Sequence, residues 1–212
     1  MTTLTTSASS SEFVNSKIVC NKEDVVLLRN DNRENDNNNS YRIIFNTHNS
    51  NFPIHSIVGL KLYTLLYELN RDVIHTFKVI NETETTIETV TLFKPFGRDF
   101  GIAPKAMHTV STMQLEQNVC TFNSVDVKQD QDIASNEINH IPKKYECIQS
   151  THSKLTVYFL SANDLQFDFT FELSDNDNDD ESNERPIYME NSLALMIKKM
   201  FSRLKMFIER ME

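Results

Sequence analysis

The sequence is poor in glycine and has no tryptophan. Only Gly59, Gly97 and Gly101 occur among its 212 residues. Loops that cradle phosphates or dinucleotides need several glycines close together, because their backbone must approach the ligand. Neither a GxxxxGK nor a GxGxxG pattern is present. The sequence therefore argues against a nucleotide-dependent enzyme of the common folds, and we predict no cofactor.

Basic residues are also scarce, with 21 lysines and arginines against 30 acidic residues and a net charge of -9. This balance disfavours general affinity for nucleic acid or anionic membranes, which requires clustered positive charge. No run approaches the roughly 18 consecutive apolar residues of a membrane span. The N-terminal MTTLTTSASSSEF has neither the basic residue nor the apolar run of a secretory signal. We therefore expect a soluble, intracellular protein of the nucleus or cytoplasm.

The side chains that usually carry chemistry are few and scattered. Cys20, Cys120 and Cys147 are odd in number and form no CxxC pair, which favours free thiols in a reducing compartment. The 6 histidines show no HExxH or HxH spacing, so no metal site is predicted. Residues 99–101 match the DFG of protein kinases, but the other kinase loops are absent. No catalytic residue is predicted, and we do not expect an enzyme.

The strongest structural pattern lies in residues 154–173, which predict two strands joined by a turn at residues 161–164. Apolar residues alternate strictly with polar ones in the second strand, at Leu165, Phe167, Phe169, Phe171 and Leu173. A period of two directs one set of side chains into a core and the other toward water. Phe169→Asp should therefore abolish soluble expression, whereas Asp168→Ser should be nearly silent.

Two helices are predicted. In residues 56–69 the polar positions Lys61, Thr64 and Glu68 form one narrow stripe, so we expect a helix buried on more than one side. This helix contains an LxxLL pattern, which leucine-rich helices often produce by chance. Residues 191–211 predict an amphipathic helix with a wide apolar stripe opposite a lysine-rich face.

The predicted fold class is α+β. We expect a bent, mostly antiparallel sheet or partly open barrel of about nine to eleven strands, with one inserted buried helix and a C-terminal amphipathic helix. Residues 12–212 are predicted to form a single domain, with a disordered tail at 1–11 and flexible loops at 30–40 and 174–185. A terminal amphipathic helix after meandering strands resembles the pleckstrin-homology architecture. That resemblance is at the level of the fold and implies no function.

The apolar helices and the lack of catalytic motifs predict a non-catalytic interaction or scaffold subunit of an intracellular, nuclear or cytoplasmic, multiprotein complex. Such a subunit would bind protein partners through apolar helix surfaces, in a hetero-oligomer. The predicted partner-binding residues share the polar side of the terminal helix and favour an acidic partner surface: Leu195, Met206, Lys198, Lys199, Arg203 and Lys205.

Two other interpretations stay open at this point. One is a structural or accessory protein of a large DNA virus, and the other is an enzyme whose site is assembled from distant residues. Residues 94–105 hold two glycines and two prolines together with Lys94, Arg98 and Lys105. This segment is either a compact structural loop or a small basic binding loop.

Overall fold

The structure is a computed structural model that describes residues 16–30, 39–95, 103–127, 141–148, 152–173 and 187–212. The predicted tail at 1–11 and the loop at 174–185 lie outside these ranges. So do residues 31–38 of the loop predicted at 30–40 and residues 96–102 of the loop predicted at 94–105. The parts of those two segments that are described include the ends of strands.

In the described residues ten strands form one sheet, in the order β1-β2-β3-β10-β9-β7-β6-β5-β4, with β8 placed beside β6. All neighbours pair antiparallel except β6 and β8. The sheet is open, because β1 and β4 lie at its two edges. The strands in chain order are β1 (Ser16–Lys22), β2 (Val25–Asn30), β3 (Asn39–His48), β4 (Ile74–Glu82), β5 (Thr86–Phe93), β6 (Lys105–Glu116), β7 (Val119–Asp126), β8 (Glu146–Cys147), β9 (Ser153–Ser161) and β10 (Asp164–Leu173).

The hairpin of β9 and β10 lies at the centre of the sheet. Phe167 lies opposite Val157 of β9 on one side and opposite Phe45 of β3 on the other. The rings of Phe45 and Phe167 are stacked, with their centroids 4.7 Å apart. Period-two alternation thus places a continuous layer of apolar side chains on one face of the sheet, as the sequence of this stretch predicts.

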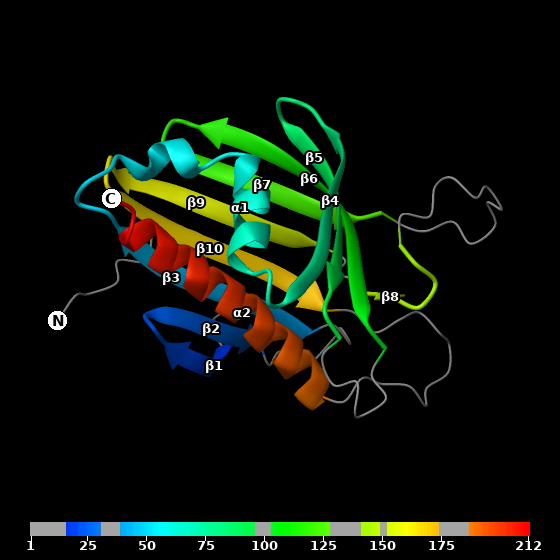
Figure 1. The fold of residues 1–212 in the computed structure, drawn as a ribbon. Coiled ribbons are helices and arrows are strands. Elements are labelled where there is room, and N and C mark those ends of the chain that lie inside the picture. Colours follow the sequence, from blue (N-terminus) through cyan, green and yellow to red (C-terminus); the bar gives the residue numbers. More distant parts are fainter. Residues whose placement is uncertain (1–15, 31–38, 96–102, 128–140, 149–151, 174–186) are drawn as a thin grey trace.

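A long C-terminal helix, α2 (Ile187–Glu209), lies diagonally across the curved sheet (Figure 1). It contacts β2, β3 and the shorter helix α1. We call the face of the sheet that packs against α2 the concave face, and the opposite face the convex face. The buried apolar residues of α2 belong to the main core: Leu193, Ala194, Phe201, Leu204 and Ile208.

The predicted inserted buried helix is wrong. Residues 54–57 form a short 3-10 turn (η1, Ile54–Ile57), and the α-helix α1 covers only Lys61–Leu69. Within α1 only Leu62 is buried, while Leu65, Leu66 and Tyr67 are partly exposed. The helix packs one side on the concave face through Tyr63, whose ring meets Phe122 edge-on at 5.9 Å. Its apolar composition therefore does not translate into burial on several sides.

The helix predicted at residues 191–211 begins earlier, at Ile187, and its buried side is wider than the apolar stripe. Lys198, Ser202 and Lys205 are 5%, 2% and 8% exposed, although the sequence places them on the polar face. Phe207, which belongs to the apolar stripe, is 37% exposed. The helix sits in the curve of the sheet, so neighbours cover more of its circumference than a flat surface would. Lysine can be buried there because its aliphatic stem is apolar.

Candidate functional site

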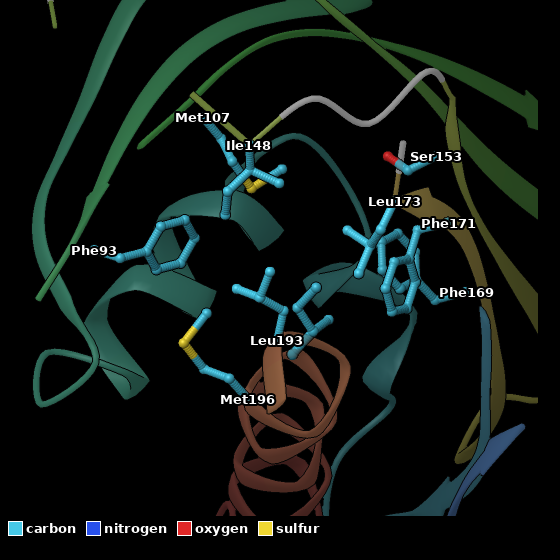
Figure 2. A pocket seen from close by; sticks show the side chains of 10 residues that line it. Phe93, Met107, Ile148, Ser153, Phe169, Phe171, Leu173, Leu193 and Met196 are labelled. Carbon is cyan, nitrogen blue, oxygen red and sulfur yellow. The ribbon is translucent and has the colours of Figure 1, made fainter. Parts of the chain in front are cut away.

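A small apolar cavity lies between the N-terminal half of α2 and the concave face of the sheet. Figure 2 shows Leu193 and Met196 of α2 on one side of this space, with Phe93, Met107 and Ile148 facing them. The cavity encloses about 30 Å³. Its walls come from α2, β5, β6, β9, β10 and residue 148: Phe93, Met107, Ile148, Ser153, Phe169, Phe171, Leu173, Leu193, Met196 and Ile197.

Local sequence periodicity explains why these walls are apolar. Phe169, Phe171 and Leu173 are spaced by two along β10, so all three project toward α2. The rings of Phe169 and Phe171 stack with centroids 5.2 Å apart. On α2, Leu193 is followed by an apolar residue three and four positions later, which brings them onto one helix face. The cavity lies where the apolar side chains of β10 and α2 face each other without filling the space between them.

The side chains around the cavity carry one hydroxyl and no charge. Ser153 is the single polar residue in the lining, and the other nine residues are apolar. In the ranges that the structure describes, no group of three histidine, cysteine, aspartate or glutamate side chains is placed to hold a metal ion. The cavity is therefore suited to an apolar molecule.

The structure separates the residues predicted to bind a partner. Leu195 is 41% exposed, while Met206 is half-buried. Lys198 donates a hydrogen bond from Nζ to the carbonyl oxygen of Lys22 at 2.9 Å, and thereby ties α2 to the β1–β2 hairpin. Lys205 forms an ion pair with Glu209, one helical turn away.

The other two predicted cations meet acidic or polar partners. Arg203 donates from Nη2 to Oδ2 of Asp72 at 2.7 Å and from Nη1 to Oδ1 of Asn70 at 3.1 Å. Lys199 lies 3.7 Å from the same aspartate. These cations serve the docking of α2 on its neighbours within the chain. Whether the group also binds another molecule stays a prediction.

Other residues considered from the sequence are dispersed. His48 lies 2.7 Å from Asp164 at one end of the sheet, and His108 lies 2.8 Å from Glu88 on β5. The DFG-like residues 99–101 and Arg98 lie outside the described ranges, whereas Lys105 begins β6 and pairs with Glu146. No helix in the described ranges is both long and apolar enough to cross a membrane.

Comparison with known proteins identifies the fold of this chain through solved structures. No protein-family model matches the sequence, and no curated protein sequence matches it. Among solved structures, the lipid transfer and protein localization domain of human StarD13 (DLC2) matches with a TM-score of 0.66, at 9% identity over 92% of this chain and 90% of that one. Human StAR-related lipid transfer protein 5 gives 0.68, at 12% identity over 93% and 88%.

A bacterial protein structure matches this chain as well. The StAR-related lipid transfer protein of Xanthomonas axonopodis matches with a TM-score of 0.61, at 11% identity over 91% of this chain and 98% of that fragment. The chain has a StAR-related lipid transfer fold. This helix-grip arrangement of a curved antiparallel sheet around a C-terminal helix replaces the resemblance to a pleckstrin-homology architecture.

This fold overturns the prediction of an interaction or scaffold subunit that binds protein partners. The similar structures are described as lipid transfer proteins or domains. The apolar faces of the two helices, which suggested protein docking, pack on the concave face. The prediction of a nuclear complex subunit has no support in these comparisons.

Sequence reasoning missed the cavity residues, although it identified several as core. The available signal was the unbroken alternation of β10 and the apolar stripe of α2, which predict that two apolar surfaces face each other. Their partners Phe93, Met107 and Ile148 are distant in sequence and carry no motif. Only the strand order brings them to one place.

Proposed function

We propose that this domain binds a lipid-like ligand between α2 and the concave face of the sheet, and acts as a carrier rather than as an enzyme. The observation that carries this proposal is the apolar cavity beneath α2. The lipid-transfer role of the solved structures with the same fold supports it. Moving an apolar ligand from water to such walls is favourable by about 25 cal/mol per Å² of buried apolar surface.

The size of the cavity sets a condition on this function. Its 30 Å³ is room for about two water molecules, whereas pockets for drug-sized ligands measure about 300–1,000 Å³. A lipid therefore has to displace lining side chains, helix α2, or both. Met107 and Met196 suit such repacking, because methionine is unbranched and has three rotatable bonds.

The test is a transfer assay with the full chain and fluorescent lipids in phosphatidylcholine vesicles. Met196→Trp places an indole in the cavity and should reduce transfer at least tenfold. Leu195→Trp changes the neighbouring residue, which is 41% exposed, and should leave transfer within about twofold of wild type. Mass spectrometry of an organic extract of the purified protein reports any lipid that it carries.

Folding is checked in parallel, because inserting a larger side chain into a core costs about 1–3 kcal/mol. Met107→Trp fills the same cavity from the sheet side, so it gives a second variant if Met196→Trp melts early. Wild-type protein that neither carries nor transfers lipid would refute the proposal. Equal transfer by the folded cavity variants and the Leu195 variant would place any ligand elsewhere.

A further inference from the structure

Three serines lie directly opposite one another across adjacent strands of the concave face. Ser153 of β9 pairs with Ser124 of β7, which in turn pairs with Ser111 of β6. Apolar residues continue the row on both sides, with Phe171 on β10 and Ile87 on β5. We call these three residues the serine row. It is a polar strip across an otherwise mostly apolar region of the core.

The hydroxyls of Ser111 and Ser124, the inner two residues of the serine row, have hydrogen-bond partners within the protein. The hydroxyl oxygens of Ser111 and Ser124 lie 2.7 Å apart, and the hydroxyl of Tyr63 on α1 lies 3.3 Å from that of Ser124. Ser111 is fully buried. Burial also raises the pKa of Tyr63, so its hydroxyl stays protonated and neutral. The three hydroxyls of Ser111, Ser124 and Tyr63 therefore form a hydrogen-bonded group without charge.

The outer end of the row differs. Within the described residues the Ser153 hydroxyl has no hydrogen-bond partner, and Ser153 lines the apolar cavity (Figure 2). A hydroxyl offers one donor and two acceptor positions. A ligand in the cavity therefore meets apolar walls and one neutral hydroxyl.

We propose that Ser153 anchors the polar end of the ligand and selects a neutral hydroxyl or carbonyl group over a charged one. This inference rests on the proposed function. A hydroxyl or carbonyl on the ligand can pair fully with Ser153, whereas a charge would enter an apolar wall without a counterion, at high cost.

The experiment uses four ligands that share one alkyl chain: dodecanol, methyl laurate, laurate and dodecylamine. Each competes with the neutral dye N-phenylnaphthylamine for the full-length protein at about pH 8, where laurate is ionised in water. We expect dodecanol and methyl laurate to bind at least tenfold more tightly than the two charged ligands.

Two isosteric variants isolate the hydroxyl. Ser153→Thr and Ser153→Val have the same branched shape, which strands accept, and differ by one hydroxyl. The threonine variant should keep the preference for dodecanol, while the valine variant should bind dodecanol about fivefold to tenfold more weakly, the effect of one neutral hydrogen bond. The dye itself should bind both variants equally.

The outcomes separate the two proposals. If neither the dye nor any of the four ligands binds, the proposed function fails and this inference fails with it. If all bind but laurate or dodecylamine competes as well as dodecanol, the ligand site stands and the neutral selectivity is wrong. Equal dodecanol affinity in the threonine and valine variants would remove Ser153 as the anchor.

Discussion

Arg42 of β3 donates two hydrogen bonds to the carboxylate of Asp168 of β10 on the convex face of the sheet. Arg42 donates from Nε to Oδ1 at 2.8 Å and from Nη2 to Oδ2 at 2.5 Å. The two side chains are only 14% and 11% exposed. The hydrogen bond to Asp168 raises the pKa of the Arg42 guanidinium, so the guanidinium stays charged. This pair links two central strands on the side away from α2.

The pair changes the expectation for Asp168. The sequence-based prediction that Asp168→Ser is nearly silent is wrong in its premise, because this carboxylate is largely buried. Removing it takes away the two hydrogen bonds that this largely buried carboxylate accepts from Arg42, so we expect a loss of about 2–4 kcal/mol in the free energy of unfolding. The double variant Arg42→Leu with Asp168→Leu should lose less. Urea denaturation of the single and double variants measures these losses. An equal loss of unfolding free energy in both would contradict the pairing of Arg42 with Asp168.

A second ion pair predicts a pH dependence. The hydrogen bond from Arg203 lowers the pKa of Asp72 to about 2, with help from the charges of Arg203 and Lys199. An unfolded aspartate titrates near 3.9. The folded carboxylate therefore stabilises the protein above about pH 4, and this contribution is lost as the pH falls toward 2. The side chain is 53% exposed, so solvent screening limits the gain to about 1 kcal/mol or less.

Asp72→Asn tests this pair. The variant should be less stable than wild type at about pH 6 in low salt, and the difference should vanish toward pH 2. Thermal melts at both pH values give the comparison. A difference that persists unchanged at the lower pH would show that the carboxylate charge is not its source.

The cysteines should differ in reactivity. All three are free, and burial raises the pKa of Cys120, 1% exposed, to about 11. Alkylating reagents attack the thiolate, so Cys120 should resist iodoacetamide at about pH 8 while the partly exposed Cys20 reacts. Peptide mass spectrometry identifies the modified positions, and protein unfolded in urea serves as the fully reactive control. Rapid native labelling of Cys120 would contradict its burial.

Local patterns predicted the elements that depend on nearby residues. The alternation in residues 165–173 specifies which side chains of β10 share a face, because the period of a strand is fixed by its backbone. The same pattern could not reveal that Asp168 meets Arg42, which lies 126 positions away. It also could not separate an exposed carboxylate from one covered by a paired cation.

Tertiary placement decided the rest. Helix α1 is apolar around most of its surface, yet only Leu62 in it is buried, and its other apolar residues stay partly exposed. The serine row needs β7 to lie between β6 and β9, and no local pattern states that order. Ser124 lies two positions after the buried Phe122 and therefore on the same face of β7. This spacing could have marked Ser124 as a polar residue that points into the core.

The position of α2 over the sheet can be tested with two phenylalanines on that helix. The ring of Phe201 lies 5.0 Å from that of Phe169 and 6.1 Å from that of Phe45, and Phe201 is 4% exposed. Phe207, which is 37% exposed, belongs to the same apolar stripe in the sequence. Phe201→Ala should cost about 3–5 kcal/mol of unfolding free energy, because it removes core contacts and leaves a cavity.

Phe207→Ala is the matched control. It makes the same chemical change on the same helix, and alanine favours the helix slightly in both variants, so the comparison isolates burial. We expect it to cost less than about 1 kcal/mol, since surface substitutions have small effects. Equal losses in urea denaturation would mean that α2 is rotated about its axis relative to the sheet. The side chains of Leu193, Met196 and Ile197 would then no longer face Phe169 and Phe171, and the proposed ligand site would lose its wall on the helix side.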